Sequence, residues 1–116
     1  MSTLGRRSGS VRRVEIWYVV VDGRIVVTGT PGARHWLANL REHAGAVLHL
    51  REPVQHLEVL AEEVTDAATR RRIAEQAWRV QPWYATQGYS VEDWVSGSPM
   101  VLLTPHFGDE AARPVR

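Results

Sequence analysis

The dipeptide Asp22-Gly23 constrains the fold of this chain more than any other feature. It joins two apolar runs, residues 11–21 and 24–30, both of which are rich in valine. Glycine adopts positive φ at no steric cost and aspartate does so at a modest one, so this pair predicts a two-residue turn between antiparallel strands. A parallel, doubly wound sheet would need a helix at this point, so the hairpin favours an antiparallel sheet instead.

The rest of the chain alternates between short helices and strands. Pro31-Gly32 breaks the second strand, the Thr65-Asp66 pair is typical of a helix start, and Pro82 ends that helix. The predicted order is strand 11–21, strand 24–30, helix 33–44, strand 46–51, strand 54–64, helix 67–80, an irregular aromatic connector over 83–98, and strand 99–104. We expect one α+β domain over residues 1–105, a small, partly open antiparallel barrel with helices at its ends, and a frayed tail over residues 106–116.

Composition excludes several classes of function. The chain of 116 residues contains no cysteine and no lysine, which rules out thiol nucleophiles, disulfides, Schiff-base lysines and phosphate-binding P-loops. Its net charge of +1 argues against a general nucleic-acid-binding protein. No apolar run approaches the roughly 20 residues that span a bilayer, and no signal peptide is recognised, so we expect a cytoplasmic protein.

The positive charge is concentrated near the start of the chain. Residues 1–13 hold four arginines and no acid, and two of these arginines lie in the turn Gly5-Arg6-Arg7-Ser8-Gly9. Backbone N–H groups, a serine hydroxyl and guanidinium groups together suit a phosphate or a polycarboxylate. A solvated basic terminus accounts for the same residues equally well, so both interpretations remain open at this point.

A second glycine-containing segment, Thr28-Gly29-Thr30-Pro31-Gly32, connects a predicted strand to a predicted helix. Backbone N–H groups at such a joint suit a phosphate or a polar ring edge, although an ordinary turn is the favoured interpretation of these residues alone. In the helix that follows, Asn39 is predicted to be a buried amide that ties neighbouring elements together, because a buried amide must find partners.

The histidines and the aromatic connector are less specific. No HExxH spacing is present and the five histidines fall on different elements, so no metal site is predicted, although His49 and His56 could face each other across a hairpin. The connector is either the wall of an apolar substrate pocket or a lid that completes the core. Its aromatic residues are Trp83, Tyr84, Tyr89 and Trp94.

Taken in order, these segments resemble the deazaflavin-dependent nitroreductase family of split β-barrel oxidoreductases. The resemblance rests on the arginine turn before a Trp-Tyr strand, the Asp-Gly hairpin, the glycine loop leading into Trp36 and Asn39, the arginine-rich helix after Asp66, and the Pro-x-Val strand after Trp94. It covers about residues 4–105 and implies a split β-barrel, a homodimer and bound coenzyme F420, with FMN as the alternative. The arginine turn lies so near the start that the strand expected before it has almost no chain to be made from.

The resemblance also implies roles for individual residues. The cofactor tail would contact Arg6, Arg7, Ser8 and Gly9, supported by Arg12 and Arg13. The other implied cofactor contacts are Trp17, Thr28, Gly29, Thr30, Gly32, Trp36 and Asn39. Tyr84 and Tyr89 would orient the acceptor or donate a proton to it. The implied function is hydride transfer from reduced F420 to a small activated alkene or nitro-type acceptor, and a non-catalytic binder of flavin or another aromatic ligand is the alternative.

Overall fold

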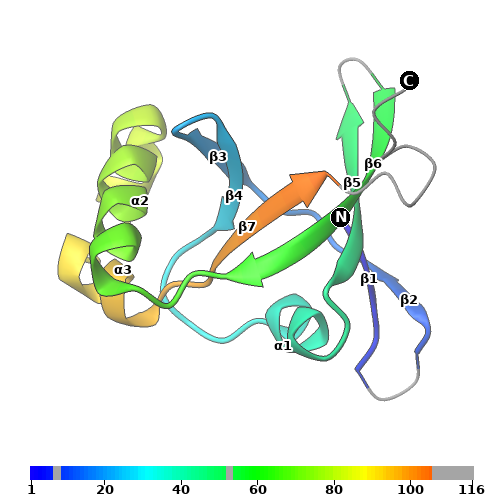
Figure 1. Cartoon of the computed structure of the whole chain (residues 1–116). Helices are drawn as coiled ribbons and strands as arrows, with labels where there is room; N and C mark the ends of the chain where they lie inside the picture. The colour runs from blue at the N-terminus through cyan, green and yellow to red at the C-terminus, as the bar shows by residue number, and fades with distance from the viewer. Residues whose placement is uncertain (7–8, 52–53, 106–116) are drawn as a thin grey trace.

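A computed structural model describes residues 1–6, 9–51 and 54–105 of the chain (Figure 1). In chain order the elements are β1 (Ser2–Leu4), β2 (Val11–Arg13), β3 (Tyr18–Val21), β4 (Arg24–Thr28), α1 (His35–Glu42), β5 (Gly45–Arg51), β6 (Val54–Glu63), α2 (Ala67–Val80), the 3-10 helix η1 (Pro82–Thr86), α3 (Val91–Gly97) and β7 (Met100–Pro105). No helix among these residues is both long enough and apolar enough to cross a bilayer.

The strands form one antiparallel sheet in the order β2-β1-β5-β6-β7-β4-β3. Six of these strands form three hairpins, β1–β2, β3–β4 and β5–β6, and β7 inserts between β6 and β4. Val27 of β4 and Leu48 of β5 belong to one core cluster although β6 and β7 separate their strands, so the sheet curls around that core. The predicted antiparallel α+β fold is confirmed. The described strands do not close the sheet between β2 and β3, so a split barrel is not confirmed.

The two faces of the curled sheet are covered differently (Figure 1). On the inner face, α1 packs its apolar side against the curl and contributes Trp36, Leu37 and Leu40 to the core. On the outer face, α2, η1 and α3 cover strands β3, β4 and β7. The alternation along β4, with Val26 in the outer cluster and Val27 in the inner one, follows from the two-residue period of a strand.

Two local predictions are confirmed in detail. Asp22 and Gly23 have φ values of 53° and 76°, the positive values that a tight hairpin turn requires. Helix α2 spans the predicted residues 67–80, and the Asp66 carboxylate accepts the backbone N–H of Thr69 at 2.9 Å as its N-cap.

Three predictions are corrected. The run 11–21 is not one strand, because β2 and β3 lie at opposite edges of the sheet and residues 14–17 must cross between them. The connector 83–98 contains η1 and α3, and α3 begins with a capping box between Ser90 and Asp93. Residues 2–4 form β1, a three-residue strand before the arginine turn. The tail 106–116 lies outside the described residues.

Candidate functional site

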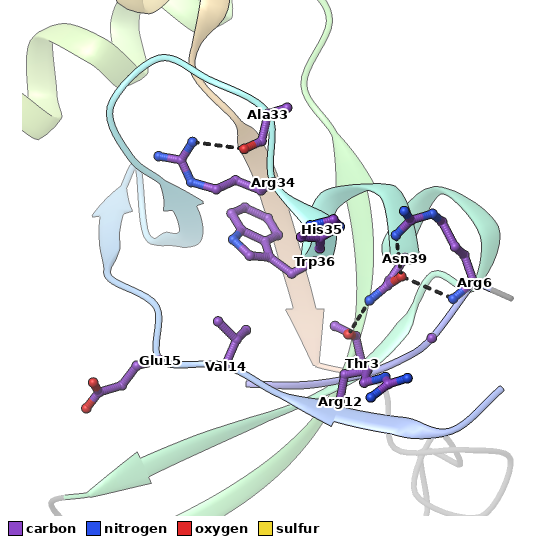
Figure 2. A pocket seen from close by; sticks show the side chains of 11 residues that line it. Thr3, Arg6, Arg12, Val14, Glu15, Ala33, Arg34, His35, Trp36 and Asn39 are labelled. Carbon is purple, nitrogen blue, oxygen red and sulfur yellow. Dashed lines mark hydrogen bonds between the residues drawn. The ribbon is translucent and has the colours of Figure 1, made fainter. Parts of the chain in front are cut away.

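A cavity of about 660 Å³ lies between the N-terminal strands and the start of α1 (Figure 2). We call it the arginine cavity. Its lining residues are Thr3, Gly5, Arg6, Arg12, Val14, Glu15, Ala33, Arg34, His35, Trp36 and Asn39.

The arginine cavity carries net positive charge. Three arginines line it against a single acid, Glu15, whose carboxylate pairs with Arg51 outside the cavity. In Figure 2 the Glu15 side chain points away from Arg12 and Arg34. An anionic group entering the cavity would therefore meet the guanidinium groups of Arg6 and Arg12, whereas that of Arg34 donates to the Thr30 and Gly32 carbonyls.

The start of α1 adds to this positive potential. Its N-cap residue is Arg34, no side chain caps the first turn, and that turn contains no acid. The free N–H groups of a first helical turn carry partial positive charge, which acidic residues normally offset. An arginine at this place is unfavourable to the helix alone, and a bound anion would remove the conflict.

Asn39 holds the arginine turn against α1 (Figure 2). Its side chain is 5% exposed, and its Oδ1 accepts the backbone N–H of Arg6 at 3.1 Å and the Arg6 Nη1 at 3.3 Å. Its Nδ2 donates to the Thr3 hydroxyl at 3.4 Å. The predicted buried amide is thus observed, and it fixes where Arg6 stands relative to the helix.

An apolar surface adjoins the charged groups. Trp36 is only 8% exposed, and its indole faces the opening between Arg34 and Val14 (Figure 2). Val14 and Ala33 complete this surface. The cavity therefore combines cationic groups with an aromatic wall, which suits a ligand that has an anionic part and a flat apolar part.

The other predicted residues of the N-terminal segment are distributed differently. Gly9 is exposed at φ 70° and donates its N–H to the Gly5 carbonyl at 2.9 Å, which closes the turn. Arg7 and Ser8 lie outside the described residues. Arg13 and Trp17 line a second cavity of about 830 Å³, the gap cavity, which shares Val14 and Glu15 with the arginine cavity.

The predicted glycine loop, Thr28-Gly29-Thr30-Pro31-Gly32, lies beside the arginine cavity and does not line it. Arg34 donates from Nη2 to the Thr30 carbonyl at 2.8 Å and from Nη1 to the Gly32 carbonyl at 2.9 Å. A Cβ at Gly29 or Gly32 would lie 3.3 or 3.1 Å from the same guanidinium, so the glycines leave room for it. Thr28 is buried and donates its hydroxyl to the Pro99 carbonyl at 2.8 Å.

The two predicted tyrosines do not lie at the arginine cavity. Tyr84 is 3% exposed, its ring centroid is 4.6 Å from that of Trp94, and burial raises its pKa above the ordinary value. Tyr89 is 39% exposed. Trp17 connects these regions, because it lines the gap cavity and its ring centroid is 6.0 Å from that of Tyr84.

Sequence reasoning missed several lining residues of the arginine cavity. Thr3 carried no signal, because its role depends on the fold that brings it to Asn39. Arg34-His35 did carry one: two basic residues stand at the start of the predicted helix, where acidic residues are favoured.

The fold and the site together define a small α+β protein with a place for an anionic aromatic ligand. The chain belongs to the F420H(2)-dependent quinone reductase family, whose model matches residues 1–105. A comparison with curated proteins finds no match. The protein is therefore an F420H2-dependent reductase, and its cofactor is coenzyme F420, as the resemblance to deazaflavin-dependent enzymes implied.

The residues of the arginine cavity fit this cofactor. F420 joins an aromatic deazaflavin ring to a phosphate and a tail of carboxylates. Guanidinium groups and the uncapped start of α1 suit the phosphate and the carboxylates, and Trp36 with Val14 suits the ring.

Proposed function

We propose that the arginine cavity binds the anionic part of F420 and that the chain reduces an acceptor of the quinone class. Arg6, Arg12 and the start of α1 hold the negative charges, and Trp36 packs against the flat part of the cofactor. The observation that carries this assignment is the cationic, uncapped start of α1 inside a cavity lined by two further arginines. The family's name supports the quinone class.

The chemistry makes modest demands on the chain. Reduced F420 supplies the hydride when bound, and the protein binds, orients and shields the reactants. No side-chain nucleophile is needed, which agrees with a chain that lacks cysteine and lysine. Activated alkenes and nitro compounds also accept hydride, and we propose them as further substrates. Tyr84, which is 3% exposed, and Tyr89 line neither the arginine cavity nor the gap cavity, so we propose no acceptor contact for them.

A fluorescence titration with F420 tests the cofactor site. The double variant Arg6→Ala/Arg12→Ala should bind F420 at least about tenfold more weakly, because it loses charge-assisted hydrogen bonds, and its binding should depend less on salt. Arg24→Ala is the matched control, since Arg24 is exposed on β4 and does not line the arginine cavity. An unchanged affinity in the double variant would contradict the assignment.

Steady-state assays with reduced F420 test the acceptor class. Water-soluble benzoquinones and naphthoquinones should be reduced faster than nitro compounds or activated alkenes. A protein that binds F420 tightly but reduces none of these acceptors would instead be the non-catalytic binder considered above.

The homodimer remains a proposal. Its support is an apolar hollow of about 280 Å³ on β1, β2, β5 and β6, lined in part by Leu4, Val11 and Leu60. These three side chains are among the exposed large apolar residues. Sedimentation of the wild type and of Val11→Glu would decide, since a dimer through this hollow should dissociate in the variant.

A further inference from the structure

The gap cavity opens where β1 stops pairing with β5. β1 pairs with Ala46 and Val47, and the pairing does not extend to residues 48–51 of β5. The crossing segment 14–17 lies on the other side of this opening. The cavity is lined by Met1, Arg13, Val14, Glu15, Ile16, Trp17, Tyr18, Leu48, His49, Leu50, Arg51, Val54 and His56.

The lining of the gap cavity divides into two kinds. Trp17, Tyr18 and Leu50 represent an apolar, aromatic part that suits a flat acceptor. Arg13, the ion pair of Glu15 with Arg51, and a histidine pair form a polar part. Because Val14 and Glu15 also line the arginine cavity, an acceptor here would be a neighbour of a cofactor bound there.

The histidine pair forms a continuous chain of hydrogen bonds. His49 and His56 stand opposite each other in the register of β5 and β6, and their Nδ1 atoms are 2.7 Å apart. The Nε2 of His49 is 2.7 Å from the Ser2 hydroxyl oxygen. Among the described residues nothing bonds to Nε2 of His56, which is left at the cavity end of the chain.

One set of tautomers makes every donor in this chain point the same way. The Ser2 hydroxyl then donates to Nε2 of His49, Nδ1–H of His49 donates to Nδ1 of His56, and Nε2–H of His56 is free to donate to a ligand. When one proton passes along these hydrogen bonds, each donor atom becomes an acceptor and each acceptor atom becomes a donor. Such a chain can transfer a proton without any heavy atom moving far.

The charges that act on His49 are positive, and the Glu15 carboxylate in the cavity lining is paired with Arg51. Burial first, then the positive charges of Arg13 and the amino terminus, lower the pKa of His49, which keeps its imidazole neutral near pH 7. The same positive field disfavours a metal cation at the pair. It favours an acceptor that becomes an anion when it is reduced.

We propose that the gap cavity binds the quinone acceptor and that the chain Ser2–His49–His56 delivers its proton. This inference rests on the proposed function. Two-electron reduction adds one hydride to the quinone and leaves a hydroquinone monoanion, which needs one proton. His56 gives the proton from Nε2 to that oxygen, its Nδ1 takes the proton of His49, Nε2 of His49 takes that of Ser2, and water restores the serine hydroxyl. After the product leaves, water protonates Nε2 of His56 and the protons shift back along the chain to Ser2, which returns one proton to water and restores the starting tautomers. The net consumption is one hydride and one proton from solvent.

Nitrogen-15 NMR of the imidazoles tests the Ser2–His49–His56 hydrogen bonds in the protein without cofactor. The free protein near pH 7 should show one Nδ1–H shared between His49 and His56, unlike isolated histidines, which favour the Nε2–H form. Two rings that both carry only Nε2–H would overturn the proposal, because no hydrogen bond could then join the two Nδ1 atoms.

Kinetics of His56→Ala test the delivery of the proton. Quinone reduction should slow by about 100-fold while F420 binding stays unchanged, and added imidazole should restore much of the rate. His56→Gln retains a polar side chain but cannot relay a proton, so it should be equally slow. This variant separates the loss of proton delivery from a folding defect caused by removing the side chain. His43→Ala is the control, since His43 is exposed and lines neither cavity.

The outcomes separate this inference from the function on which it rests. A wild type that does not bind F420 would overturn the proposed function. A wild type that binds F420 but reduces no quinone would overturn the acceptor assignment and the proton chain together. A wild type that reduces quinones at the same rate as His56→Ala would overturn the proton chain alone.

Discussion

The two sides of the curled sheet differ in how far they are closed. Under α2, η1 and α3 the packing is closed and apolar, and Trp94 and Ala77 are fully buried. Arg70 of α2 donates to the Val95 carbonyl of α3 and to the Val64 carbonyl directly after β6. On the other side, the core that α1 completes lies beside the arginine cavity and the gap cavity, which are open and charged. Both sides hold a buried apolar core, and α1 covers part of the inner side, but both charged cavities lie on the inner side. Substitutions under α2 and α3 should therefore change stability alone, whereas substitutions at the cavities should change ligand binding.

The largest expected effect lies on the covered side. Trp94→Ala should lower the free energy of unfolding by about 3–5 kcal/mol, because it leaves a large cavity beneath α3. Val80→Ala, at a side chain that is 52% exposed on α2, is the control and should change stability little. Urea denaturation measures both, and a loss for Trp94→Ala no larger than that of the control would refute the division between the two sides.

Asn39 should break the separation, because it serves both stability and binding. Asn39→Ala should cost about 1–3 kcal/mol of unfolding free energy, since it leaves the Arg6 N–H and the Thr3 hydroxyl without their buried partner. It should also weaken F420 binding, because Arg6 loses its position. Glu42→Ala, on the exposed side of the same helix, should change neither quantity.

A smaller effect should appear at alkaline pH. Tyr84 has a pKa above its ordinary value of 10.0 because it is buried, so the unfolded chain loses this proton first. Its contribution to stability is therefore complete below about pH 10 and is lost as the pH rises further. With no lysine or cysteine, the tyrosines are the main side chains that titrate in this range.

Tyr84→Phe should make the alkaline decline in unfolding free energy shallower, because the variant has no buried phenol to ionise. Unfolding curves measured at several pH values compare the variant with the wild type. An identical decline in wild type and Tyr84→Phe would show that Tyr84 ionises as easily in the folded protein as in the unfolded one.

Local signals in the sequence predicted local structure well. The Asp22-Gly23 turn, the Asp66 cap with its helix over 67–80, and the pairing of His49 with His56 were all readable, because each depends on neighbours in the chain or on strand alternation. The break in the run 11–21 was not readable. Its residues favour a strand throughout, and only the position of β2 and β3 at opposite edges of the sheet requires a crossing there.

The candidate site shows the same division. Arg6, Arg12, Trp36 and Asn39 were predicted and do line one cavity, whereas the predicted glycine loop supports Arg34 beside that cavity and Tyr84 packs in the core under the helices. A motif indicates which chemical groups are available, but the curvature of the sheet decides which of them share a cavity.

By itself, the sequence determined the antiparallel hairpins, the main helix, the cationic start of the chain and a chemistry without cysteine or lysine, because these follow from residue type and short-range geometry. The tertiary structure alone decided that the start of α1 adds Arg34 to the arginine turn, and that the Ser2–His49–His56 chain borders a second cavity beside the first. Those groups are far apart in the chain, and only the curl of an open sheet brings them together.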